Sequence, residues 1–198
     1  MTNRRKNQVP RSSILDLGDY ERQRDEIRAR SMSARAIRRI ELGPNATLAF
    51  ESRETVAYQI QEMLRAERIA REPDVAHEIE TYSDLLPTAE ELSATLMFEF
   101  PEPGAREVSL RDLVGFEGHL HLELDGAGRS TAFFDRRQID ADRISAVQFI
   151  RFPLDAAQRE ALARGASIRV VADHPKYAHT AGLSPDACAA LAKDLLDV

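Results

Sequence analysis

The sequence has 198 residues, 43% of them hydrophobic, and a single cysteine, Cys188. This length and composition suffice for one well-packed core. One cysteine excludes an internal disulfide and a self-contained zinc or iron–sulfur site with four cysteine ligands. No apolar run reaches membrane-spanning length and no signal-peptide pattern follows the basic N-terminus, so we expect a cytoplasmic protein without membrane insertion.

The charges are distributed unevenly along the chain. Residues 1–39 contain 11 Lys/Arg and 5 Asp/Glu, and the other residues contain 16 and 28, giving net charges of +6 and −12. A basic segment can attract nucleic acid, but these arginines are spread around a predicted helix with no aromatic side chains between them. We therefore expect this segment to pack against the acidic part of the chain, and we do not expect nucleic-acid binding.

The N-terminal half reads as a tail followed by helices around one hairpin. Residues 1–13 are polar and rich in Ser and Arg, which predicts a disordered basic tail ahead of a single domain over residues 14–198. Periodicity and turn residues then predict a helix, a β-hairpin and a helical hairpin, over residues 19–34, 37–51 and 53–85. Thr88 and Glu91 have the spacing of a capping box and predict another short helical turn.

The C-terminal half changes to strand-like patterns. The predicted strands are residues 94–100, 119–124, 130–134, 144–152 and 168–172. Short helices are expected at 110–114 and 155–164, and Ser184 with Pro185 begins a final helix. Hairpin-like strands with helices grouped before and after them predict an α+β fold. We expect a largely antiparallel sheet on which the N-terminal hairpin, the helical hairpin and the C-terminal helix pack.

Three groups of polar residues are candidates for a site, since the common nucleotide, hydrolase, zinc-protease and calcium motifs are absent. The first is Glu67, which a helical wheel places at the centre of the apolar face of helix 53–71. A carboxylate there needs a cation such as Arg71, or it serves as an acid, a base or a metal ligand. We favour a pair with an arginine or a place at the edge of the core, because buried pairs often have only a structural role.

The second group is His119, His121 and Glu123, which alternate with leucines and therefore share one face of a strand. Two histidines at this spacing can hold one metal ion, but Glu123 is too far along the strand to join His119, so a third ligand must come from elsewhere. A solvated polar face is the favoured interpretation.

The third group is Asp173, His174, Tyr177 and His179, in the segment DHPKYAH. This segment follows a predicted strand and contains a stiffening proline, and loops after strands often carry sites. The two histidines could bind a metal ion together with a carboxylate such as Glu67. The alternative is an ordered turn without a site.

Four stretches, LGPNATLAFE, TVAYQIQEMLRAERI, AVQFIRF and DHPKYAH, resemble an uncharacterised bacterial family known only as a domain of unknown function. The resemblance runs from Leu15 to the end of the chain, and HLHLE is not part of it. It implies a genomic context of rubrerythrin-like and iron–sulfur proteins, and hence redox or peroxide-stress physiology. The binding residues that it implies are Tyr58, Gln59, Gln61, Glu62, Arg65, Glu67, Asp173, His174, Tyr177 and His179.

Two function classes follow. The first is a non-catalytic accessory protein that binds an iron–sulfur or rubrerythrin-like partner through the helix at 58–68 and the DHPKYAH segment. Tyr58, Glu62 and Arg65 lie opposite the apolar face of that helix, so both of its sides would be contacted. The alternative is a metal-dependent enzyme or metal sensor with His174, His179 and Glu67 as ligands. No cofactor is predicted for the first class, and the second requires a single metal ion.

Overall fold

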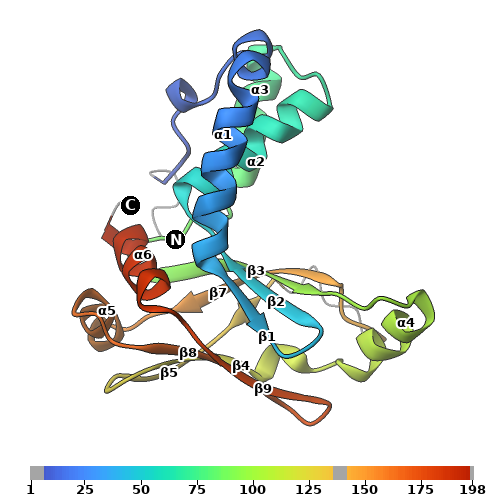
Figure 1. Cartoon of the computed structure of the whole chain (residues 1–198), viewed down its shortest axis with the longest axis vertical. Helices are drawn as coiled ribbons and strands as arrows, with labels where there is room; N and C mark the ends of the chain where they lie inside the picture. Colours follow the sequence, from blue (N-terminus) through green and yellow to red (C-terminus); the bar gives the residue numbers. More distant parts are fainter. Residues whose placement is uncertain (1–6, 136–141, 197–198) are drawn as a thin grey trace.

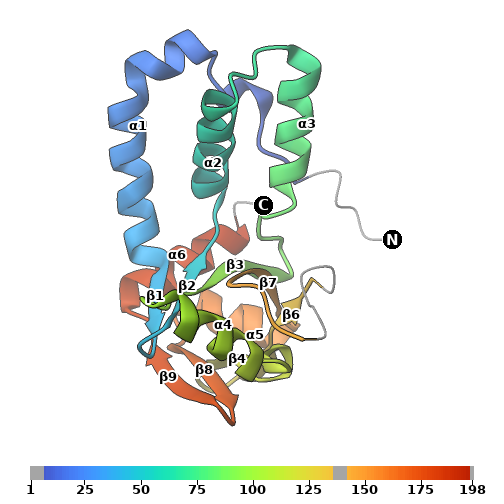
Figure 2. The ribbon, with the colours of Figure 1, turned by 90° about the vertical axis from the view of Figure 1, so that its right-hand side faces the viewer.

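The computed structural model describes residues 7–135 and 142–196 of the chain. Two antiparallel β-sheets are stacked in one half of the molecule, and three helices project from them as an arm (Figure 1). After a quarter turn the arm still stands clear of both sheets (Figure 2). The predicted α+β class with antiparallel strands is confirmed.

The first sheet, sheet A, supports the arm. Its strands in spatial order are β1 (Arg39–Leu42), β2 (Ala46–Phe50), β3 (Glu91–Phe98), β7 (Val147–Pro153) and β6 (Phe133–Phe134). The predicted N-terminal hairpin is present as β1 and β2, and β3 pairs with both β2 and β7. Strand β3 alternates buried and partly exposed residues from Ala94 to Phe98, as expected for a sheet with one face on the core, whereas Ser93 is buried on the other face.

The second sheet, sheet B, lies on the other side of the core. Its strands in spatial order are β5 (Gly128–Thr131), β4 (Leu120–Leu124), β8 (Ile168–His174) and β9 (Tyr177–Gly182). The leucines of β4 are at most 3% exposed, as predicted, but His121 is only 6% exposed, so the expectation of a solvated polar face fails at this histidine. The inner faces of the two sheets form one hydrophobic core centred on Phe116, which makes edge-on contacts with Phe98 and Phe134.

The arm consists of α1 (Leu17–Arg38), α2 (Arg53–Ala66) and α3 (Glu72–Ser83). It has a small core of its own, separate from that of the sheets. The members of this core are Val9, Ile14, Val56, Ile60, Leu64, Val75, Ile79 and Leu86. The predicted N-cap of α2 is confirmed, since Ser52 and Thr55 exchange reciprocal hydrogen bonds.

Three further helices lie against the sheets. They are α4 (Pro103–Asp112), α5 (Ala156–Ala163) and α6 (Pro185–Leu196). Helix α6 starts where Ser184 and Pro185 predict it, and Ser184 Oγ accepts a hydrogen bond from the amide of Ala187. The guanidinium of Arg38 on α1 makes two hydrogen bonds of 2.9 Å to Asp194 on α6, and this pair fixes the arm to the body.

Several sequence-based expectations need correction. Residues 7–13 are ordered, with Val9 only 1% exposed, whereas the rest of the expected disordered tail, residues 1–6, lies outside the described residues. The strands form two sheets instead of one. Thr88 and Glu91 form an isolated β-bridge that leads into β3 and not a helical turn. The helix expected at residues 110–114 is the end of the longer α4.

Candidate functional site

The helix motif places its polar residues between α2 and α1. Glu62 accepts two hydrogen bonds of 2.8 Å from the guanidinium of Arg24 and one of 2.5 Å from the hydroxyl of Tyr20. The bonds from Arg24, followed by that from Tyr20, outweigh burial and lower the pKa of Glu62 to about 2. Burial and the hydrogen bond to this carboxylate raise the pKa of Tyr20. The predicted contacts on this side of α2 are therefore made within the chain.

The neighbouring motif residues also have partners inside the arm. The Gln61 side chain accepts from the amide of Leu15 and donates to its carbonyl, at 2.8 and 3.1 Å. Arg65 pairs with Glu21, and Arg35 lies over the ring of Tyr58. Gln59 accepts a bond of 3.4 Å from Arg35 and also hydrogen-bonds to Tyr82. These side chains hold α1 and the N-terminal segment against α2. Contacts within the chain therefore explain the motif residues, and no protein partner is needed to explain them.

Glu67 does not lie where the helical wheel places it. Helix α2 ends at Ala66, and Arg68 adopts a left-handed conformation with φ of 55°. The amide of Ile69 then bonds to the carbonyl of Leu64, which is the closing bond of a Schellman motif. Because the chain leaves the helix at this point, Glu67 is exposed and its expected place on a buried apolar face is wrong.

The DHPKYAH segment is a β-hairpin, not a loop. It ends β8, turns at Pro175 and Lys176, and begins β9. The hydroxyl of Tyr177 donates to the carbonyl of Leu42 at 2.6 Å and accepts from the amide of Asn45 at 3.0 Å. Burial raises the pKa of this phenol, which keeps it protonated as a donor.

His179 lies against the same β1–β2 turn. A Cβ added to Gly43 would be 2.5 Å from its imidazole ring, and Gly43 has φ of 71°. Two of the stretches that carry the family resemblance, LGPNATLAFE and DHPKYAH, are thus in contact. Tyr177 and His179 stabilise the structure at this contact.

Asp173 joins the two histidines of HLHLE. Its carboxylate oxygens lie 2.9 Å from Nδ1 of His119 and 3.3 Å from Nε2 of His121, and Arg129 donates to it at 3.0 Å. The hydrogen bond from His119 is the largest cause of the lowered pKa of Asp173, and His121 and Arg129 also contribute. Asp173 lies close to both histidines because β4 and β8 are adjacent antiparallel strands whose register brings these positions together. We predicted a polar face here, but we did not predict that Asp173 would join it.

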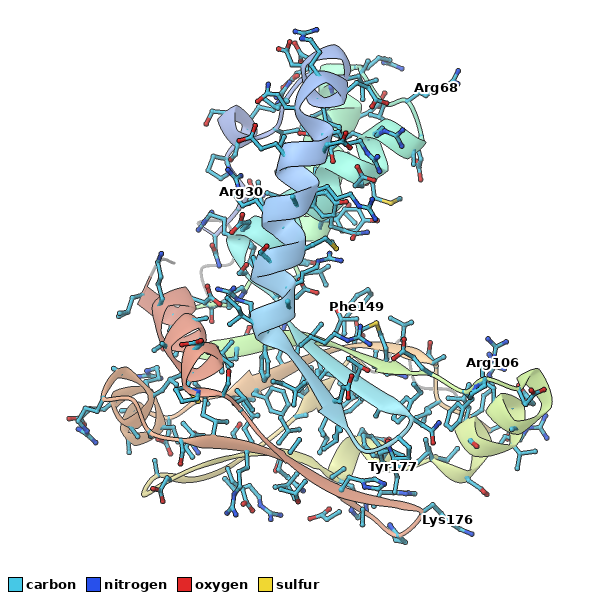
Figure 3. All side chains as sticks on the ribbon, in the orientation of Figure 1. Arg30, Arg68, Arg106, Phe149, Lys176 and Tyr177 are labelled. Carbon is cyan, nitrogen blue, oxygen red and sulfur yellow. The ribbon has the colours of Figure 1, made fainter. Side chains whose placement is uncertain are left out.

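The residues of the metal hypothesis are not brought together. His174 is 6% exposed and packs against Phe116 at the sheet end of the molecule. Figure 3 shows Arg68, the neighbour of Glu67, on the arm, and Lys176 and Tyr177 at the opposite end of the molecule. No group of three His, Cys, Asp or Glu side chains within residues 7–135 and 142–196 is arranged to hold a metal ion.

A groove opens between α3 and the outer face of sheet A. We call it the arm–sheet groove. Its volume is about 740 Å³, which is within the range of ligand-binding and anchor-binding pockets. Figure 3 shows Phe149 on the face of sheet A that is turned toward the arm.

The floor of the arm–sheet groove carries exposed aromatic side chains. Phe133 on β6 is 60% exposed and Phe149 on β7 is 39% exposed. Val147, two residues before Phe149 on the same face, is 45% exposed. Large apolar side chains gathered on one exposed sheet face are typical of interaction surfaces.

The walls of the arm–sheet groove are acidic. Among its described lining residues, the carboxylates outnumber the only guanidinium, that of Arg151. These carboxylates are Glu51, Glu80, Asp84 and Asp135. Arg151 pairs with Glu91 and donates to the carbonyl of Asp84, so its charge is largely compensated. The groove therefore favours a cationic partner.

Tyr82 also lines this groove, and its hydroxyl hydrogen-bonds to the side chain of Gln59. Burial is the main cause that raises the pKa of Tyr82, and the Glu78 carboxylate adds to it, so the phenol stays protonated. Sequence reasoning missed the groove altogether. A usable signal was the run 146–152, which has apolar residues on both faces of the predicted strand and thereby indicates that the outer face also makes contacts.

Comparison with known proteins places the chain in a family. The family model described as Protein of unknown function (DUF3501) matches residues 8–195. The crystal structure of a novel protein of unknown function from Burkholderia pseudomallei K96243 is similar, with 34% sequence identity and a TM-score of 0.87. The match covers 94% of this chain and 98% of that one. Comparison with curated proteins gives no significant match. None of the described helices has the length and apolar character needed to cross a bilayer.

Proposed function

Because the chain belongs to the family described as Protein of unknown function (DUF3501), we propose a function from its own geometry: an accessory protein that binds a redox partner in the arm–sheet groove. The observation that carries this proposal is the exposure of Phe133 and Phe149 on the floor of an acidic groove. The redox character of the partner, iron–sulfur or rubrerythrin-like, rests on the family resemblance alone.

The groove favours a particular kind of partner surface. Aromatic anchors in a concave site supply most of the binding energy of a protein interface, and complementary charge increases the association rate and selects the partner. The carboxylates of Glu80 and Asp84 favour Lys or Arg side chains on that surface. We therefore expect a basic segment that presents at least one apolar side chain to Phe133.

This surface differs from the one that the sequence suggested. The helix residues 58–65 have partners within the arm, and Tyr177 and His179 hold the β1–β2 turn. The arm–sheet groove, in contrast, is a concave surface with exposed apolar side chains. The motif residues would then contribute to binding only by fixing the arm that forms one wall of the groove.

The test is titration calorimetry with purified rubrerythrin-like and iron–sulfur proteins from the same genome, on the full chain at about 50 and 300 mM salt. We expect saturable 1:1 binding that weakens as salt increases. Phe133→Asp should reduce the affinity about tenfold or more. Val108→Asp is the matched control, since Val108 on α4 is equally exposed at 61% and lies outside the groove.

The proposal is wrong if neither protein binds, or if binding occurs and Phe133→Asp weakens it no more than Val108→Asp. A partner whose affinity is unaffected by salt would contradict the role assigned to the acidic walls. Circular dichroism of both variants verifies that each one is folded before titration.

A further inference from the structure

The described chain begins beside the arm–sheet groove. The amide of Val9 donates a hydrogen bond of 3.1 Å to Oγ of Ser83, the last residue of α3. The side-chain amide of Asn7 donates to the carbonyl of Pro87. Asp84, which follows Ser83, lines the groove. The first described residues are therefore attached to the stretch of chain that forms one wall of the groove.

These first residues are held in place by the arm. Val9 is 1% exposed and belongs to the small core of the arm. The guanidinium of Arg53 on α2 donates to the carbonyl of Gln8 at 2.7 Å and to the side chain of Asn7 at 3.0 Å. The chain that precedes Asn7 therefore starts from a fixed point close to the end of α3.

The six residues before this point are strongly basic. Residues 1–6 lie outside the described residues, and their sequence is MTNRRK. It has three cationic side chains, no carboxylate, and one large apolar side chain, that of Met1. An extended chain spans about 3.3–3.6 Å per residue, so six residues reach about 20 Å. Glu80 in the groove precedes Ser83 by three residues, which is about 4.5 Å along the axis of α3, so it lies within this reach.

The wall of the groove carries uncompensated negative charge. Glu80 and Asp84 are exposed, and neither carboxylate forms an ion pair with another residue that the structure describes. The C-terminal end of a helix carries a partial negative charge and favours cations nearby. The last turn of α3 contains no basic residue, and Asp84 is its C-cap. A cationic side chain at this position would therefore relieve the repulsion between these carboxylates and the helix end.

The floor of the groove complements the rest of the segment. Phe133 and Phe149 are large exposed aromatic side chains on this floor (Figure 3 labels Phe149). A guanidinium stacks on aromatic rings, and the stems of Arg and Lys cover apolar surface. A methionine side chain adapts to irregular apolar surfaces. The sequence MTNRRK thus combines the basic charge and the apolar side chain that the groove favours in a partner.

We propose that residues 1–6 bind in the arm–sheet groove of their own chain and compete there with the redox partner. The arginines of this segment would pair with the carboxylates of Glu80 and Asp84. Because the segment is tethered, its effective concentration at the groove is on the order of millimolar, so weak contacts suffice to keep it bound. The competition rests on the proposed function of the groove, whereas the docking of the segment does not.

Paramagnetic broadening in amide NMR spectra of the full chain tests the docking without any partner. A nitroxide is attached to Thr2→Cys, and the buried Cys188 should not react with the reagent, which mass spectrometry of the parent chain verifies. We expect the label to broaden the amide signal of Phe149 at about 50 mM salt, and to do so several-fold less at about 300 mM salt.

Two triple variants separate specific pairing from net charge. The first replaces the three cationic residues of the segment by glutamine: Arg4→Gln, Arg5→Gln and Lys6→Gln. The matched control replaces three exposed cationic residues that lie outside the groove: Arg28→Gln, Arg68→Gln and Lys176→Gln. Both variants lose the same charge. The first should reduce the broadening of Phe149 several-fold, and the control should leave it unchanged.

The proposal is overturned if Phe149 is not broadened at about 50 mM salt, or if the two triple variants broaden it equally. Failure of the partner-binding proposal looks different, since then no redox protein binds in calorimetry while the label still broadens Phe149. If a redox protein does bind, the first variant should bind it several-fold more tightly than the control variant, and equal affinities would contradict the competition.

Discussion

The ion pair between α1 and α2 makes a strong prediction about acid stability. The pKa of Glu62 is lowered from its ordinary value of 4.5 to about 2 by Arg24 and Tyr20, and the carboxylate is only 24% exposed. A difference of one pKa unit between the folded and unfolded states is worth about 1.4 kcal/mol. The ionised carboxylate should therefore contribute about 3 kcal/mol to the free energy of unfolding at pH 7.

The sign of the pH dependence follows from the direction of the shift. Because the pKa of Glu62 is lower in the folded state, its contribution is complete above the unfolded value of 4.5 and is lost as the pH falls toward 2. Glu62→Gln should therefore be less stable than the parent protein by about 3 kcal/mol at neutral pH. The difference between the two proteins should shrink steadily below about pH 5.

Urea denaturation followed by circular dichroism at several pH values measures this difference directly. Comparison with the parent protein cancels the contributions of the other carboxylates. Glu67→Gln is the matched control, because it removes the same charge from an exposed position just after the same helix and should change stability by less than about 0.5 kcal/mol. Equal stabilities of the two variants, or a difference that does not decline with acidification, would refute the reasoning.

Four further substitutions, one of them a control, test the packing around the sheets by thermal or urea denaturation. Gly43→Ala should cost more than about 2 kcal/mol, since its Cβ would meet the His179 ring, whereas Gly128→Ala, with φ of 82° and open space around it, should cost only about 1 kcal/mol. Tyr177→Phe loses two hydrogen bonds to the main chain and should cost about 1–3 kcal/mol. Phe116→Ala opens a cavity at a fully buried aromatic contact and should cost about 3–5 kcal/mol. A cost below about 1 kcal/mol for this last substitution would mean that Phe116 is not central to the core.

Elements with strong local signals could be predicted from the sequence. Ser52 caps α2 as expected, Ser184 and Pro185 begin α6, and the turn after Leu42 closes the first hairpin. The leucines of HLHLE point to the core as their alternation indicates. Each of these features depends on residues within a few positions of one another, so short-range periodicity and capping chemistry specify them.

The ends of helices and the positions of single polar side chains were harder to predict from the sequence. The wheel that buries Glu67 assumes a helix through residue 71, but the left-handed conformation of Arg68 ends it five residues earlier, at Ala66. A non-glycine residue with positive φ has no clear local signature, because its conformation is stabilised by the bonds that close the helix. The helical turn predicted at Thr88 failed for a similar reason, since capping-box spacing also occurs in short turns.

The pattern of residues thus determined most of the helices and strands and their antiparallel pairing, but not β9, which lies in a segment expected to be a loop. Only the tertiary structure decided that the strands form two sheets, that Asp173 reaches His119 across 54 residues of chain, and that α1 closes over the polar side of α2. The physical reason is that strand register and helix docking depend on contacts between distant segments. Their free energy comes from the burial of surfaces that no local window of sequence contains.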